Sequence, residues 1–168
     1  MGFRLFWCAV IVSCGCFFGL ELRRRLYIRL RSLEMFRGYF RTVRAYISHF
    51  GMSLCAIADE IDKGGNTSKF SLILREKLQH SDFPAAFSNT LDEVKNSLSL
   101  YDDDVALLVS IANRMGGLDL DSAVSSLNLA DEQLSSVIDS AKDKCETDGK
   151  IYAVLGLSCG IAVALLLL

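Results

Sequence analysis

Residues 26–50, LYIRLRSLEMFRGYFRTVRAYISHF, decide the fold because their apolar side chains recur in steps of three and four. This spacing is typical of an α-helix with one apolar stripe. Arg29, Arg37, Arg41 and Arg44 lie off the stripe, on the polar face of the same helix. We therefore predict one long amphipathic helix whose buried stripe consists of Leu26, Leu30, Leu33, Phe36, Phe40, Val43, Ile47 and Phe50.

Shorter apolar stripes follow this helix, and residues that end or cap helices separate them. Gly51, Gly64-Gly65 and Gly116-Gly117 are expected to end helices. No segment alternates apolar and polar residues over five or more positions, which argues against a sheet. We predict an all-α fold, a bundle of about six helices, with the later helices beginning near Ser53, Ser68, Ser81 or Asp82, Asp102 and Asp119.

Both ends of the chain are apolar. Residues 151–168 carry no charge and would reach about 27 Å as a helix, close to the hydrocarbon thickness of a bilayer. Residues 3–22 include only Arg4 and Glu21 as charged residues. We predict a transmembrane helix at residues 3–22, a cytosolic α-helical domain at residues 23–150 and a second transmembrane helix at residues 151–168.

A cleaved signal is the alternative for the N-terminal segment. Ile11-Val12-Ser13-Cys14 is similar to a lipoprotein cleavage site, so cleavage or lipidation at Cys14 stays open. Apolar residues continue past Cys14, and the arginine run that follows resists translocation. An uncleaved membrane helix is therefore the preferred interpretation.

Charge is divided unevenly along the chain. Residues 1–50 hold nine arginines and two glutamates, a net charge of +7, whereas residues 51–150 have a net charge of −9. The basic residues gather next to the apolar ends, at Arg23, Arg24 and Arg25 and again at Lys142 and Lys144. Basic flanks tend to remain in the cytoplasm, so we expect the domain there and both termini on the far side.

The sequence carries no sign of catalytic chemistry. Its six cysteines form no C-x-x-C pair, and it has only two histidines and no nucleophile-elbow, zinc-protease or phosphate-loop motif. Asp102, Asp103 and Asp104 are better explained as the capping start of a helix than as a metal site. We predict a protein that is not an enzyme and that has no cofactor and no metal.

The order of features resembles the stage III sporulation protein AB family of endospore-forming bacteria. A Gly-x-x-Leu (Gly51 to Leu54) precedes Ile57-Ala58, and Met115-Gly116 precedes Asp119 by three residues. A long final helix carries Leu127 and Leu134, and Leu155-Gly156 precedes the leucines at residues 165–168. The resemblance covers nearly the whole chain and is most specific from residue 115 onward.

The resemblance implies a cytosolic domain similar to the helical domain of the type II secretion inner-membrane platform protein. It implies a non-enzymatic platform or assembly component of the channel between mother cell and forespore. The implied partners are other channel proteins, including a secretion-type ATPase and ring-forming membrane proteins, together with membrane lipids and no nucleic acid. The implied location is the mother-cell membrane around the forespore, with the domain in the cytoplasm and the termini in the intermembrane space.

A second hypothesis, a membrane-anchored regulatory adaptor that dimerises through residues 26–50, follows from the near-heptad spacing of the first stripe. Under the platform hypothesis, charged surfaces are candidate contact sites for partners, with plain solvated faces as the alternative interpretation. The candidate partner-binding residues are Arg29, Arg37, Arg41, Arg44, Asp92, Glu93, Asp102, Asp103 and Asp104.

Overall fold

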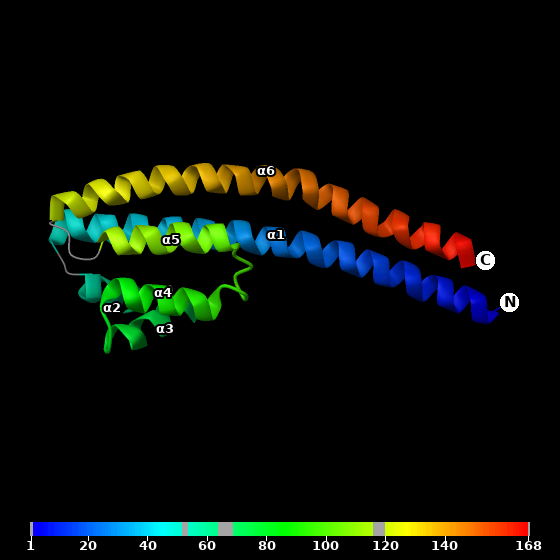
Figure 1. The fold of residues 1–168 in the computed structure, drawn as a ribbon, viewed down its shortest axis with the longest axis horizontal. Helices are drawn as coiled ribbons and strands as arrows, with labels where there is room; N and C mark the ends of the chain where they lie inside the picture. Colours follow the sequence, from blue (N-terminus) through cyan, green and yellow to red (C-terminus); the bar gives the residue numbers. More distant parts are fainter. Residues whose placement is uncertain (1, 52–53, 64–68, 116–119, 168) are drawn as a thin grey trace. The chain divides into compact units, whose positions relative to one another are not determined.

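The computed structural model describes residues 2–51, 54–63, 69–115 and 120–167, and of the side chains near both chain ends it describes only some. All regular structure within these ranges is helical (Figure 1). The six helices are α1 (Gly2–Phe50), α2 (Leu54–Lys63), α3 (Lys69–Leu78), α4 (Phe83–Val94), α5 (Asp102–Met115) and α6 (Leu120–Leu167). The predicted all-α fold with about six helices is confirmed.

The chain divides into two compact units, which are called the terminal unit and the central unit below. The terminal unit combines Met1–Arg31 with Ile138–Leu168, and the central unit is Ser32–Val137. The long helices α1 and α6 each contribute to both units. Both division points fall inside the predicted 23–150 domain.

The core of the central unit is built on the apolar stripe of α1. Leu33, Phe36, Phe40, Val43 and Ile47 are all buried, as the spacing predicts. Phe50, the last residue of the predicted stripe, is instead 70 % exposed, because it ends α1 beyond the core. Its ring contacts those of Tyr46 and His49, which lie on the same end of the helix.

Aromatic rings from three helices meet around Phe87 of α4, which is fully buried. Its ring centroid lies 5.2 Å from that of Phe70, 5.7 Å from Phe83, 5.8 Å from Phe40 and 6.2 Å from Phe36. Centroid separations of 4.5–7 Å are favourable for aromatic pairs. This cluster joins α1, α3 and α4 into one core.

Helix ends follow the local signals that the sequence carries. Gly51 adopts φ +58°, a left-handed conformation that glycine tolerates, and its N–H donates to Ile47 O at 3.0 Å. Asp82 is the N-cap residue of α4, and Pro84 stands in the first turn as predicted. The predicted cap Ser53 and the predicted stops Gly64-Gly65 and Gly116-Gly117 lie outside the described residues.

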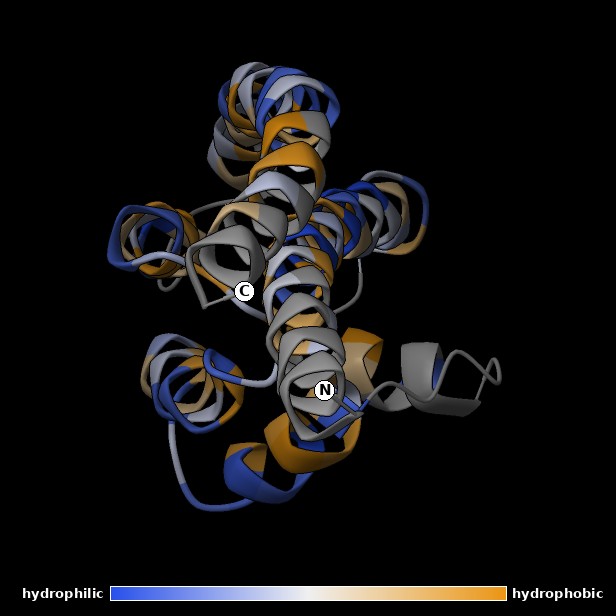
Figure 2. Cartoon of the chain, turned by 90° about the vertical axis from the view of Figure 1, so that its right-hand side faces the viewer, coloured by the Kyte–Doolittle hydropathy of each residue, from blue (hydrophilic) through white to orange (hydrophobic). Residues whose placement is uncertain are grey.

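Most helices carry hydrophilic and hydrophobic residues around their circumference (Figure 2). In the part of the chain that the structure describes, none of the helices combines the length and the apolarity that crossing a bilayer requires. The predicted spans at residues 3–22 and 151–168 lie mostly outside the described side chains. Gly149, which could have ended the last helix, lies within α6.

Candidate functional site

The arginine face of α1 binds α6 inside the central unit. Arg37 Nε donates to Asp131 Oδ1 at 2.8 Å, and its Nη2 donates to Oδ2 at 3.3 Å. Arg41 makes the same two-pronged contact, with Nε 2.7 Å from Oδ1 and Nη2 3.0 Å from Oδ2. Two guanidinium groups one helical turn apart therefore share one carboxylate.

This arrangement changes the acidity of the shared carboxyl group. The hydrogen bonds from Arg41 and then Arg37 hold the pKa of Asp131 well below its usual range, against a smaller opposing effect of desolvation. The hydrogen bond with Asp131 raises the pKa of Arg41 in turn. Asp131 is therefore ionised at physiological pH, and the cluster keeps one positive charge in excess.

The other two arginines of the predicted partner surface are placed differently. Arg44 Nη1 donates to Asn128 Oδ1 of α6 at 2.6 Å, one turn beyond the Asp131 contact. Arg29 is only 8 % exposed and belongs to the terminal unit. Arg114 of α5, which the sequence did not single out, donates to Gln133 Oε1 of α6 at 3.0 Å. The polar face of α1 in the central unit thus serves largely to hold α6.

The acidic candidates lie on α4 and α5. Asp92 pairs with Lys95 at 3.1 Å, and Glu93 pairs with Lys77 of α3 at 2.9 Å. Asp102 and Asp103 are exposed in the first turn of α5. Asp92 and Glu93 are therefore paired within the protein, and Asp102 and Asp103 are the members of this set that are exposed without such a pair in the described residues.

The prediction that Asp104 belongs to a partner-binding surface is wrong, because its side chain is buried. Its Oδ2 accepts a hydrogen bond from the backbone N–H of Tyr101 at 3.0 Å. The carboxylate thus satisfies one of the backbone donors that the start of α5 leaves unpaired. This is the capping role that the sequence predicted for the aspartate run.

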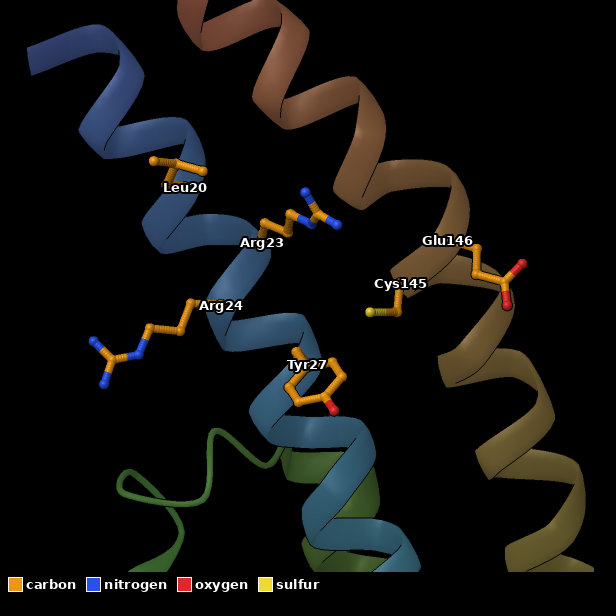
Figure 3. Close-up of a pocket in the computed structure, with 6 residues that line it drawn as sticks. All are labelled: Leu20, Arg23, Arg24, Tyr27, Cys145 and Glu146. Atoms are coloured by element: carbon orange, nitrogen blue, oxygen red, sulfur yellow. The ribbon is translucent and has the colours of Figure 1, made fainter. Parts of the chain in front are cut away.

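A solvent-open groove lies between α1 and α6 in the terminal unit (Figure 3). Its volume is about 560 Å³, and its walls are formed by Leu20, Arg23, Arg24, Tyr27, Cys145 and Glu146. Arg23 of α1 points toward α6, and Cys145 of α6 points toward α1 (Figure 3). Arg24 and Glu146 point outward, away from the facing helix (Figure 3).

Comparison with known proteins identifies the family. A family model described as stage III sporulation protein AB matches residues 4–168. The chain belongs to this family. Family membership gives the protein a role in sporulation, and the family is not a known enzyme family. No curated protein and no solved structure matches the chain.

Several residues of the family resemblance lie in the core. Ile57, Met115, Leu127 and Leu134 are buried in the central unit, and Ala58 is buried as well. Gly116 and Asp119, which belong to the same pattern, lie outside the described residues. These residues of the pattern contribute to the core, whereas Leu155, which also belongs to it, is exposed.

Among the residues that the structure describes, no three His, Cys, Asp or Glu side chains lie together as metal ligands would. The groove residues Arg23, Tyr27 and Cys145 were missed by sequence reasoning, because more than a hundred residues separate α1 from this part of α6. The run of Arg23, Arg24 and Arg25 was the one sequence feature that could have indicated an anion-binding groove, but it did not indicate which arginine faces α6.

Proposed function

We propose that the protein is a non-enzymatic membrane platform of a secretion-like channel between mother cell and forespore. The match of the family model to residues 4–168 carries this proposal, because it joins both apolar ends and the helical domain in one family. The resemblance of that family to a secretion platform supplies the mechanical role. The protein would work by holding other channel proteins in place.

Membrane anchoring is supported by the sequence of the two ends. Residues 3–22 and 151–168 are almost uncharged and long enough, as helices, for about one bilayer thickness. Basic residues adjoin both segments, which favours a domain in the mother-cell cytoplasm and termini in the intermembrane space. Residues 1–31 and 138–168 belong to the same compact unit, so two anchoring helices could pack on each other.

Burial in the central unit favours the platform over the adaptor. A dimer through residues 26–50 would need an exposed apolar stripe, yet Leu33, Phe36 and Phe40 are each at most 2 % exposed. Arg37 and Arg41 on the neighbouring face are occupied by Asp131. Exposing this stripe to a second copy would mean opening the core.

The exposed acidic residues at the start of α5 are the surface we assign to protein partners. Asp102 and Asp103 are exposed, and no hydrogen bond or ion pair ties either side chain to another described residue. They adjoin exposed Tyr101, and aromatic residues are enriched in interfaces. A basic surface on a secretion-type ATPase or on a ring protein would complement this patch.

Co-purification tests the proposal directly. Tagged full-length protein, extracted with detergent from sporulating cells after crosslinking, should capture the secretion-type ATPase or ring proteins. Asp102→Asn with Asp103→Asn should weaken this capture, whereas Glu76→Gln with Asp82→Asn removes the same charge elsewhere and should not. Recovery of homodimers crosslinked through residues 26–50, without channel proteins, would favour the adaptor instead.

A further inference from the structure

We propose that the groove of the terminal unit binds the phosphate head group of an anionic phospholipid, with Arg23 as its principal cation. The proposal rests on the membrane location of the proposed function and adds a defined lipid site to it. Lipid phosphates are recognised by guanidinium groups through charge-assisted hydrogen bonds. The argument depends on where Arg23 points, on what surrounds it and on the apolar residues next to it.

Arg23 is directed into the groove by the packing of α1 on α6. Its aliphatic stem crosses Gly149, where a Cβ atom would lie 3.4 Å from Arg23 Cγ and 3.9 Å from both Cδ and Nε. These are ordinary contact distances, so the stem leaves room at position 149 for little more than a methyl group. The guanidinium group then points toward α6, across the groove that Cys145 also lines (Figure 3).

Among the three consecutive arginines, Arg23 is the one whose guanidinium group is placed to bind an anion in the groove. Arg24 and Arg25 lie near Glu21, with nitrogen–oxygen distances of 3.8 and 3.7 Å. No hydrogen bond or ion pair joins Arg23 to any other side chain that the structure describes, and the carboxylate of Glu146 points out of the groove (Figure 3). The exposed phenol of Tyr27 offers a neutral hydrogen-bond donor on the same wall.

The apolar surroundings favour a lipid over a soluble anion or an acidic peptide. Phe17, Phe18 and Leu20 are exposed on α1 within two turns of Arg23, toward the N-terminus. Val154 and Leu155 are exposed on α6 beyond Gly149, toward the C-terminus. Exposed apolar side chains therefore lie close along the chain to the groove on both helices that form it. A phosphate in the groove would have its acyl chains beside these side chains.

Two matched variants distinguish specific binding in the groove from non-specific electrostatic attraction between arginines and an anionic membrane. Arg23→Gln and Arg25→Gln remove one positive charge at nearly the same level of α1, but Arg25 does not line the groove. Full-length protein in a non-ionic detergent would be titrated with phosphatidylglycerol, and bound lipid would be counted by native mass spectrometry. We expect roughly tenfold weaker binding for Arg23→Gln and less than about twofold for Arg25→Gln.

Gly149→Leu provides an independent test that keeps every charge. Its side chain would occupy the space that the Arg23 stem crosses, so we expect a loss of lipid binding similar to that of Arg23→Gln. Unchanged helical circular dichroism would show that these variants remain folded. Equal weakening by Arg23→Gln and Arg25→Gln, or equal binding of phosphatidylglycerol and phosphatidylcholine by the wild type, would overturn the proposal.

Membrane association is measured separately, by recovery of the protein in membranes after an alkaline wash. Arg23→Gln should remain in this fraction, because one lipid site does not determine anchoring. If wild-type protein is absent from it, the proposed function fails. If it is present and Arg23 has no special effect, only the lipid site fails. Tighter Arg23-dependent binding of a polyglutamate peptide than of phosphatidylglycerol would assign the groove to an acidic protein segment instead.

Discussion

Arginines of one helix serve different purposes in the two units. In the central unit, Arg37 and Arg41 both bind Asp131 of α6. In the terminal unit, Arg23 also reaches toward α6, but the residue it crosses is Gly149. The facing helix therefore decides whether an arginine stabilises the fold or is left for a ligand. We therefore expect substitutions in the central unit to change the free energy of unfolding, and substitutions in the terminal unit to change lipid binding.

The largest effect is expected for Phe87→Ala in the central unit. Phe87 is fully buried among four other aromatic rings, so its truncation should lower the free energy of unfolding by roughly 3–5 kcal/mol. Phe18→Ala, a matched change in the terminal unit, alters a ring that is 69 % exposed and should have little effect. Thermal unfolding of the full-length protein, followed by circular dichroism, measures both. Equal losses would mean that Phe18 is also part of a core.

Asp131→Asn should have the next largest effect. The substitution leaves two guanidinium groups without their shared anion, and we expect a loss of roughly 1–2 kcal/mol after allowing for partial exposure. Glu132→Gln alters an exposed neighbour on the same helix and serves as the control. Denaturant midpoints of the two variants test the difference. A stability for Asp131→Asn equal to that of Glu132→Gln would show that the Asp131 cluster does not hold α6.

The same carboxylate predicts a pH dependence. Its pKa is lowered in the folded state relative to about 3.9 for an unfolded aspartate, so its contribution is complete above that value. The contribution decreases as pH falls through about 4 toward the lowered pKa. The difference in melting temperature between wild type and Asp131→Asn should therefore be largest near pH 7 and should shrink below about pH 4. A constant difference down to pH 3 would contradict the assigned role.

Local features of the fold could be predicted from the sequence because a helix encodes its own periodicity and its own ends. The stripe from Leu33 to Ile47, the stop at Gly51 and the cap at Asp82 are each set by residues within a few positions. Family membership was also visible, because the order and spacing of the residues that suggest it can be read along the sequence. These predictions required no knowledge of which helices meet.

Contacts between distant helices could not be predicted in the same way. The chain holds twenty acidic residues, and nothing local indicates that Asp131 faces Arg37 and Arg41. The register between α1 and α6 decides this, and register is a property of the packed core. Gly149 shows the same limit, because no local signal indicates that the stem of Arg23 crosses it within α6.

The two glycines Gly51 and Gly149 provide the smallest and sharpest test of the comparison. Gly51 has a φ of +58°, so Gly51→Ala should destabilise the central unit by about 1 kcal/mol through backbone strain. Gly149→Ala places a Cβ at an ordinary contact distance of 3.4 Å from Arg23 Cγ, so stability should stay within about 0.5 kcal/mol of wild type. Gly38→Ala, in an open part of α1, should slightly stabilise the protein and controls for helix propensity. A larger loss for Gly149→Ala than for Gly51→Ala would show that the approach of Arg23 to α6 supports the fold, and the distinction between the two units would then fail.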